Sequence, residues 1–402
     1  MSSAATYEPG AIFSVEEGEN TSVPRVFIAP HRHIQGDGIL DHIGRYLKII
    51  PTKQAAILIS EGGQRRLGER LLGSLNDAHI DYVVINFNGE CSLEEIERIT
   101  DILRTQSIPV DCVVAVGGGK CVDAGKCVAY RLGTPVVICP SLASNDAPCS
   151  ALSVIYTREG VSEGVEFFPT SPAIVAVDTR IVAEAPVRYL VAGMGDAMAT
   201  WYEANTCFLN PKARTTVGAR PTLAAGAIGK LCATTLFEYG VSGAEAVERS
   251  EVNDALERVV EANTLLSGLG FESGGLAAAH AVAQALTVVP GMHRNYLHGE
   301  MVAIGLLTQL VLEKQTDEAS KVARFFAKVG LPVQFGQLSL APKNKSQLVE
   351  VMEEAVATPI MANEPLTVTT ELLVAAALQV NELGTDVTSS EGCVAFDALH
   401  GH

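Results

Sequence analysis

The first 186 residues alternate between short apolar runs and helical stretches, and this alternation limits the fold more than any other feature. The apolar runs are bounded by Gly, Pro and Asn and occupy 55–60, 82–87, 112–116, 135–139, 153–156 and 173–178. Helical patterns lie between several of them, at 67–76, 92–105 and 120–130. Strands that alternate with helices are typical of βαβ units around a parallel sheet. We therefore predict an α/β domain, in which the runs at 153–156 and 173–178 extend the sheet.

The pattern changes after Pro186, where long helical periodicities replace the strand-like runs. They occupy 189–204, 221–240, 248–268, 276–289, 301–314 and 317–329. A chain of 402 residues is long enough for two domains. We predict an acidic N-terminal arm at 1–24, an α/β domain at 25–186 and an all-helical domain at 187–402. Beyond about residue 337 we expect a linker around 342–345, two helices and a tail.

The net charge of −17 makes nucleic acid and anionic membrane surfaces poor partners. The longest uncharged stretch, Ser273 to His293, contains His280, Gln284 and Pro290, which favour a buried helix over a membrane span. The first 24 residues have four acidic and no basic side chains before Arg25, so they resemble neither a signal peptide nor a mitochondrial presequence. We expect a cytoplasmic protein. Its nine cysteines form no CxxC pair, which favours reduced thiols.

Three consecutive glycines follow the apolar run that ends at Val116. Gly117, Gly118 and Gly119 lead through Lys120 into a helical stretch, an arrangement that presents backbone N–H groups to a pyrophosphate. A nucleoside-triphosphate P-loop is excluded, because the positions for its first Gly and its Ser or Thr hold Val114 and Cys121. The alternative is that the glycines only make a tight turn.

A dinucleotide also requires a carboxylate for its ribose hydroxyls, at the end of an earlier strand. Glu61 directly follows the run at 55–60 and occupies that place. A carboxylate there favours NAD, because it repels the additional phosphate of NADP. Arg65 and Arg66 lie close enough in the sequence to leave this preference open.

The loop from Pro140 to Ser150 follows another strand, so we expect it at the same edge of the sheet as the glycines. It contains Ser141, Ser144, Asn145 and Asp146, whose side chains can hydrogen-bond a polyol. A turn that only caps neighbouring elements is an equally good interpretation of the sequence.

Three polar residues interrupt apolar helical stretches in the second half of the chain: Asp196, His280 and His298. A single histidine on an apolar helix is more often a hydrogen-bonded core residue than a metal ligand. Two imidazoles and a carboxylate together change this balance, since they form a common ligand set of catalytic zinc. We predict one metal site from these three residues, and His293 is near enough to His298 in the sequence to support a metal ligand or to face the substrate.

These segments together resemble the glycerol dehydrogenase family, in the superfamily of the iron-containing alcohol dehydrogenases and dehydroquinate synthase. The similarity is carried by Gly117–Lys120 with Asp123 and Lys126, by 144–156 and by 261–280, and it extends from about Arg25 to Pro332. The resemblance implies that Asp196, His280 and His298 bind one zinc ion per subunit and that Asp146 binds the substrate. It also implies that NAD is contacted by Glu61, Gly117, Gly118, Gly119, Lys120, Cys121, Ser141, Ser144, Ser150, Leu152 and Tyr156.

The chain departs from the family pattern in several places. Cys121 replaces the usual Thr after the lysine, and Asn145 replaces a Thr or Ser beside Asp146. The segment 291–295 lacks the paired histidines of the family. The iron-type relatives have a fourth ligand, a His four residues after the Asp, where this chain has Thr200. Three ligands and an open position suit zinc.

The resemblance implies NAD-dependent oxidation of glycerol to dihydroxyacetone, with Asp146 and the three metal ligands as the catalytic residues and the metal as Lewis acid. The alternatives are a related polyol or glycerol-1-phosphate dehydrogenase and a non-catalytic NAD-binding homologue. Because relatives are commonly octamers, we also expect a homo-oligomer.

Overall fold

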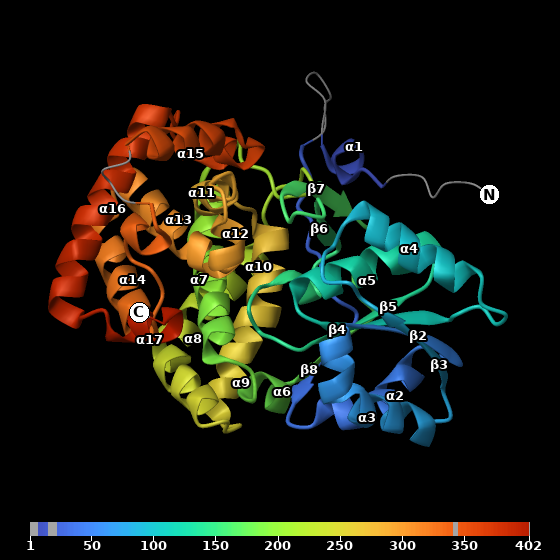
Figure 1. Ribbon diagram of the computed structural model, residues 1–402. Coiled ribbons are helices and arrows are strands. Elements are labelled where there is room, and N and C mark those ends of the chain that lie inside the picture. The colour runs from blue at the N-terminus through green and yellow to red at the C-terminus, as the bar shows by residue number, and fades with distance from the viewer. Residues whose placement is uncertain (1–6, 15–21, 341–344, 402) are drawn as a thin grey trace.

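The computed structural model describes residues 7–14, 22–340 and 345–401. The chain forms an α/β part and a helical part that lie side by side (Figure 1). Most of the predicted linker at 342–345, and much of the predicted arm at 1–24, lie outside the described residues. Within the arm, the short helix α1 spans Pro9–Phe13. Among the described residues, no helix combines the length and the apolar character that a membrane span requires.

The α/β part is built on a six-stranded sheet in which every neighbouring pair of strands is parallel. The strands, in spatial order, are β1 (His33–Gly36), β8 (Ile174–Asp178), β5 (Val136–Pro140), β4 (Cys112–Gly117), β2 (Gln54–Ile59) and β3 (Asp81–Asn86). A parallel sheet followed by helices confirms the predicted fold class.

Helices cover both faces of the sheet. In β2, Ala55, Ile57 and Ile59 pack on the side of α2 (Ile43–Tyr46) and α3 (Glu61–Asp77). Ala56 and Leu58 point to the other side, toward α4 (Leu93–Arg104) and α5 (Gly119–Leu132). This alternation follows from the two-residue period of a strand, and burial on both faces explains the continuous apolar runs of the sequence.

Two features of the sheet differ from the prediction. The segment at 153–156 forms β6 (Leu152–Tyr156), which pairs antiparallel with β7 (Ser162–Phe167) in a separate sheet, so the prediction that it extends the main sheet is wrong. Contacts with α5 hold it there, because the Val154 N–H donates to Asp123 Oδ2. The edge strand β1 was missed, since four half-buried residues give little apolar signal.

The helical part contains seven helices of eight or more residues before residue 330, described here in chain order. They are α7 (Val187–Leu209), α8 (Leu223–Glu248), α9 (Asp254–Glu261), α10 (Ser267–Gly274), α11 (Ala278–Leu286), α13 (His298–Leu312) and α14 (Thr316–Val329). The prediction of one helix over 248–268 is wrong. Helix α8 continues to Glu248, Asn253 caps α9 through the Leu256 N–H, and a π-helical turn, Ala262–Leu266, joins α9 to α10.

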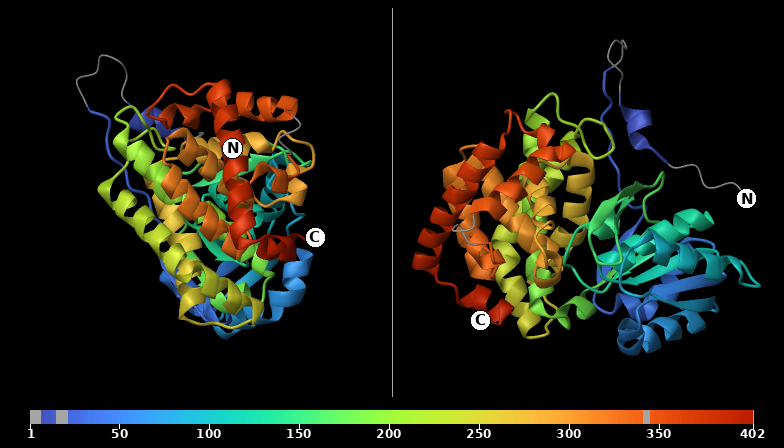
Figure 2. Two further views of the ribbon diagram at one scale, coloured as in Figure 1. Left: turned by 90° about the vertical axis from the view of Figure 1, so that its left-hand side faces the viewer. Right: turned by 45° about the horizontal axis from the view of Figure 1, so that its top comes forward.

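The remaining helices enclose this bundle. They are the short α6 (Thr179–Ala183) and α12 (Met292–Asn295) and the C-terminal α15 (Lys345–Ala357), α16 (Thr370–Glu391) and α17 (Val394–His400). Figure 2 shows α16 and α17, in red, on the side away from the sheet, and the β6–β7 hairpin, in green, at the boundary between the two parts.

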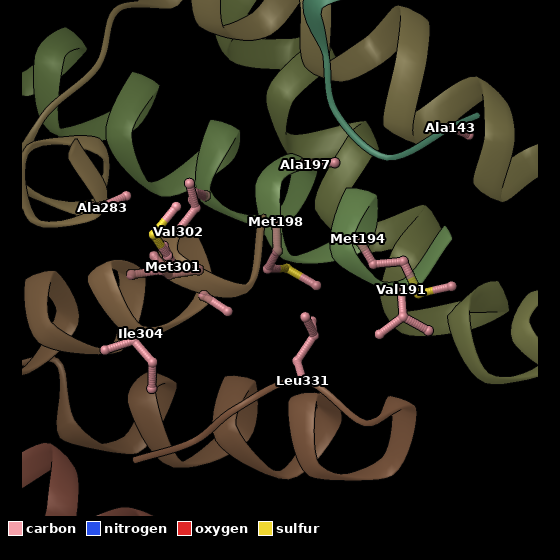
Figure 3. Close-up of a cluster of buried hydrophobic side chains, with 14 of the residues drawn as sticks. Ala143, Val191, Met194, Ala197, Met198, Ala283, Met301, Val302, Ile304 and Leu331 are labelled. Carbon is pink, nitrogen blue, oxygen red and sulfur yellow. The ribbon is translucent and has the colours of Figure 1, made fainter. Parts of the chain in front are cut away.

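Helices α7 and α13 form the centre of the helical core. Met194 and Met198 of α7 pack with Met301 of α13 and with Leu331 (Figure 3). The two backbones approach closely at Gly195 and Gly299. A Cβ atom on Gly299 would lie 1.7 Å from the carbonyl oxygen of Ala192, so only glycine allows this contact. The contact brings Asp196, which follows Gly195, close to His298, which precedes Gly299.

Candidate functional site

The strand order creates a crevice between β2 and β4. The chain leaves β2 toward β3 at one edge of the sheet and leaves β4 toward β5 in the other direction. Ligands of open parallel sheets bind at such a reversal, at the carboxyl ends of the strands. Glu61 begins α3 just after β2, and the three glycines lie between β4 and α5. Ile59 pairs with Val116, so the two loops are neighbours.

The glycine loop has the features of an anion site. Helix α5 has no side-chain cap at Gly118, whereas Ser60 and Ser92 cap α3 and α4. Uncapped N–H groups at a helix start favour a negatively charged ligand. A Cβ atom on Gly119 would lie 2.5 Å from Asn145 Nδ2. Glycine there allows the loop from Pro140 to Ser150, called the substrate loop below, to approach the glycine loop closely.

The other residues that we predicted to contact NAD differ in their burial and in the contacts that they make within the protein. Lys120 Nζ lies 2.7 Å from Glu90 Oε2 and 5.5 Å from the Tyr156 ring centre, and the Ser141 N–H donates to the Gly117 carbonyl. Ser144 is half-buried. The Cys121 side chain points inward, with Sγ 3.6 Å from the carbonyl oxygens of Leu58 and Val116, and burial raises its pKa to about 12.

Lys126 connects the cofactor helix to the substrate loop. Its buried ammonium group lies 2.6 Å from the Ala147 oxygen, 3.0 Å from Ser150 Oγ, 2.8 Å from the Leu152 oxygen and 3.3 Å from Asp123 Oδ1. Ser150 and Leu152, both predicted to contact NAD, are therefore occupied in this contact. The sequence marked Lys126 as part of the family motif but did not show that it fastens the loop.

Asp196, His280 and His298 come together from α7, α11 and the start of α13. Their ligand atoms lie within 4.8 Å of one another. His280 Nε2 is 3.3 Å and His298 Nε2 3.4 Å from Asp196 Oδ1, an oxygen that is buried without a hydrogen-bond partner. Ligands about 2.0–2.1 Å from a tetrahedral zinc ion lie about 3.3–3.4 Å apart. The three side chains thus fit a metal ion.

The carboxylate of Asp196 and the imidazole of His280 stabilise each other's charged forms. Burial raises the pKa of Asp196, but the nearby imidazoles of His298 and His280 outweigh it and hold this pKa below its usual range. Burial lowers the pKa of His280, but Glu203 and Asp196 outweigh it and hold this pKa well above its usual value. His298 is the most exposed of the three, with 47% of its side chain accessible, so the site opens on its side.

Asp146 lies beside this cluster. Its N–H donates to Asp196 Oδ2 at 3.2 Å, and its carboxylate accepts a hydrogen bond of 3.1 Å from Ser267 Oγ. Ser267 is in turn hydrogen-bonded to Thr200 at 2.8 Å. Burial, together with the charge of Asp196, raises the pKa of Asp146 to about 7. The substrate loop is thus fixed directly to a predicted metal ligand.

Two buried glutamates close to the metal-binding residues in the sequence were missed. Glu203 Oε2 lies 2.5 Å from His280 Nδ1. Glu300 accepts the Leu297 N–H at the start of α13 and pairs with Arg188. Glu203 left a signal, since it is seven residues after Asp196 on one helix face. Glu300 is three residues after Leu297, the spacing of a capping box, but leucine has no side-chain acceptor, so only half of that motif is present.

His293 makes a side-chain contact with the hairpin of the α/β part, and its role in supporting a metal ligand or facing the substrate stays a prediction. Its Nε2 is 3.0 Å from the carbonyl oxygen of Glu159, in the turn of the β6–β7 hairpin. It therefore contacts the α/β part across the boundary.

An open pocket of about 790 Å³ lies next to the glycine loop. Ser141 and Leu142 line it together with Arg66, Arg70 and Ile181. Pockets of this size commonly hold a cofactor or a drug-sized ligand.

Comparisons with known proteins agree with this architecture. Residues 30–179 match the iron-containing alcohol dehydrogenase family. The chain is 44% identical over 346 residues to the glycerol dehydrogenase of Thermotoga maritima, covering 86% of this chain and 93% of that protein. It is 38% identical to the glycolaldehyde reductase of Halobacterium salinarum, covering 90% and 98%. The crystal structure of glycerol dehydrogenase from Schizosaccharomyces pombe superposes with a TM-score of 0.87 at 32% identity, covering 92% and 94%. The chain is therefore an oxidoreductase that belongs to the glycerol dehydrogenase branch of the iron-containing alcohol dehydrogenase family.

Proposed function

We propose that this protein oxidises glycerol to dihydroxyacetone with NAD, at one zinc ion per subunit held by Asp196, His280 and His298. The observation that carries the proposal is the convergence of three ligand atoms around a buried oxygen that has no hydrogen-bond partner. Asp146 lies directly beside it. The similarity to relatives named for glycerol supports the choice of substrate.

The side chains divide the work between them. A bound zinc ion supplies Lewis acidity, which lowers the pKa of a substrate hydroxyl. Asp146, held by Ser267, accepts a hydrogen bond from a polyol hydroxyl and orients the carbon that loses hydride. The N–H groups at the start of α5 bind the pyrophosphate of NAD. Asn145 lies close to Gly119, where the missing Cβ leaves room for the two loops to approach each other.

Glu61 completes the proposed cofactor site. It lies at the carboxyl end of β2, where a carboxylate binds the ribose hydroxyls of NAD. Its side chain is 78% exposed and pairs with Arg65 at 2.6 Å, so it is accessible to a ligand.

Two observations favour zinc over iron. Thr200, at the position of the fourth iron ligand, has a hydroxyl that is hydrogen-bonded to Ser267 and cannot supply an imidazole. The separations of the two imidazole nitrogens from Asp196 Oδ1, 3.3 and 3.4 Å, are also compatible with edges of a tetrahedron, the usual geometry of zinc.

A phosphorylated substrate fits less well. Lys126, the buried cation that contacts the substrate loop, has four oxygen acceptors within 3.3 Å and three N–H groups to share among them. It therefore has no free donor for a phosphate. The similarity to a protein named glycolaldehyde reductase makes short hydroxyaldehydes the second candidate substrates, in the reducing direction.

The test is NADH absorbance with glycerol, 1,2-propanediol and glycerol 1-phosphate as substrates, and NADH consumption with glycolaldehyde. Metal content per subunit is measured in the same preparations. We expect turnover with glycerol and about one zinc per subunit. Full turnover in a metal-free preparation, or a preference for glycerol 1-phosphate, contradicts the proposal.

The functional division at 25–186 and 187–402, the homo-oligomer and the cytoplasmic location stay predictions. Under this division the glycine loop and Asp146 belong to the first unit and the three metal ligands to the second. Light scattering of the purified protein measures the number of subunits, and cell fractionation measures the compartment.

A further inference from the structure

The first turn of α11, which carries His280, is capped in an unusual way. The first four N–H groups of a helix have no partner within the helix, and a Ser, Thr, Asp or Asn at the cap usually accepts from one of them. The cap of α11 is Ala277, which has no side-chain acceptor. The turn is buried, so water cannot replace the missing partner without cost.

Three side chains from distant parts of the sequence accept these hydrogen bonds. Glu203 Oε1, from α7, accepts from the N–H groups of Ala277 at 2.8 Å and His280 at 2.9 Å. Glu364 Oε1 accepts from Ala278 at 3.0 Å, and Gln309 Oε1, from α13, accepts from Ala279 at 2.9 Å. All three side chains are buried. The position of α11 along its axis is therefore fixed by α7, α13 and the segment before α16.

Glu203 differs from the other two acceptors because it also reaches the imidazole. Its Oε2 lies 2.5 Å from His280 Nδ1. A carboxylate only accepts hydrogen bonds, so this contact places a proton on Nδ1. The lone pair of the neutral ring is then on Nε2, which faces Asp196 Oδ1 at 3.3 Å.

We propose that Glu203 is the positioning residue of the metal site: one oxygen fixes the helix that carries His280, and the other fixes the tautomer in which Nε2 binds the metal. The inference rests on the proposed function, because it assumes that Asp196, His280 and His298 hold a metal ion. Carboxylate partners of metal-bound histidines typically contribute 10–100-fold to metal affinity.

Glutamine at position 203 separates the two tasks. It has nearly the same shape, but it has one oxygen acceptor and one NH₂ donor. If its oxygen keeps the α11 amides, its NH₂ group faces Nδ1 and favours the opposite tautomer, with the proton on Nε2. If its oxygen turns to Nδ1, the amides of Ala277 and His280 lose their acceptor. Either arrangement weakens the metal site.

Glu364 provides a matched control. It is also a buried glutamate that accepts an N–H of the first turn of α11, but none of its hydrogen bonds among the described residues goes to His280. We compare full-length wild type, Glu203→Gln and Glu364→Gln. Zinc affinity is measured by competition with a chromogenic chelator, and the visible absorption spectrum is recorded for each protein saturated with cobalt(II).

We expect Glu203→Gln to lower zinc affinity by about 10–100-fold and to change the cobalt spectrum. Glu364→Gln should keep zinc affinity within about threefold and keep the wild-type spectrum. Equal losses in both variants, with unchanged spectra, mean that Glu203 acts only as a helix cap and overturn the inference. Wild-type affinity in Glu203→Gln overturns it as well.

Failure of the proposed function gives a different result. In that case the wild type itself binds no zinc at these residues, and His280→Ala has the same metal content as the wild type. If Glu203→Gln does not fold, Glu203→Asp carries the test, because it keeps the charge but is one methylene too short to span both the amides and Nδ1. It should lose zinc affinity in the same way, and wild-type affinity in this variant overturns the inference.

Discussion

At the scale of single residues, several side chains around the site are linked by chains of hydrogen bonds. Thr200 shows this most clearly. Its hydroxyl holds Ser267, which holds Asp146, and its methyl group would lie 2.3 Å from a Cβ atom on Gly270. Thr200 therefore packs closely against the backbone at Gly270, and a larger side chain at position 200 would require its neighbours to move. The position serves the substrate loop.

Asp146→Asn tests the assignment of Asp146 to the substrate. An amide is a weaker acceptor than a carboxylate and alters the bond from Ser267, so orientation of the polyol should suffer. We expect kcat/KM for glycerol to fall by about 100-fold, while NADH affinity, measured by fluorescence titration, changes less than about threefold. A parallel loss of NADH affinity assigns Asp146 to the cofactor instead.

Glu61→Ser tests the cofactor preference. The wild type should use NAD far better than NADP, because the carboxylate repels the 2′-phosphate. The substitution removes this repulsion and frees Arg65 from its 2.6 Å ion pair. The ratio of kcat/KM with NAD to kcat/KM with NADP should therefore fall by about tenfold or more. Equal efficiency with both cofactors in the wild type would contradict the role of Glu61.

At the scale of elements, the substrate loop takes its shape from the helices around it. Lys126 of α5 binds the loop at Ala147 and Leu152. Glu272 of α10 accepts the Ala151 N–H at 2.8 Å, and burial raises the pKa of Glu272 to about 7. The loop therefore joins the sheet, the cofactor helix and the metal-binding bundle.

Lys126→Met should destabilise the whole chain. It leaves the buried Asp123 carboxylate and two loop carbonyls without their cation, a loss of about 3–5 kcal/mol in the free energy of unfolding. Urea denaturation measures it. The control is Arg104→Met, which breaks an exposed pair of 3.5 Å and should cost less than about 1 kcal/mol. Similar losses in both variants would show that Lys126 does not fasten the loop.

Glu364→Gln should change how stability depends on pH. Burial and the charge of Glu313 raise the pKa of Glu364 to about 9. Between the unfolded pKa of about 4.5 and this value, the folded chain holds a proton that the unfolded chain releases, so wild-type stability falls as pH rises. Glutamine does not titrate and still accepts the Ala278 N–H. Between pH 5 and pH 8, the free energy of unfolding measured by urea denaturation should decrease by about 1–3 kcal/mol less in the variant than in the wild type. Equal decreases in the two proteins would contradict this.

At the scale of the whole molecule, the metal site exists only where three helices meet. Asp196, His280 and His298 are separated by up to 102 positions, and the close contact of Gly195 with Gly299 brings α7 and α13 together. His280 is also paired with Asp196 and Glu203, and apolar side chains of α7 and α13 pack with each other independently of the three ligands. We therefore expect the bundle to keep its packing without the metal.

Removal of the metal by a chelator should abolish turnover and leave the fold intact. We expect the metal-free protein to keep its circular dichroism spectrum and its NADH binding, with a melting temperature lower by only a few degrees. Added zinc should restore the chelated wild type but not His280→Ala. Global unfolding on chelation would show that the metal holds the bundle together.

The sequence by itself was sufficient for whatever depends on local pattern. Continuous apolar runs predicted the buried strands of the main sheet, because a parallel sheet buries both faces. The three glycines predicted a tight turn with free N–H groups, since that property belongs to the backbone of those residues. Asp196, His280 and His298 were recognisable as polar interruptions of apolar helices, because burying such groups without partners is costly.

Only the tertiary structure decided which groups satisfy one another. β6 leaves the main sheet because Asp123 and Lys126 of α5 hold it, and no pattern within 153–156 records that contact. The amides of α11 are capped by Glu203, Glu364 and Gln309, which lie far from it in the sequence. Local patterns report what each segment must bury or bond, whereas the identity of the partner depends on how distant segments pack.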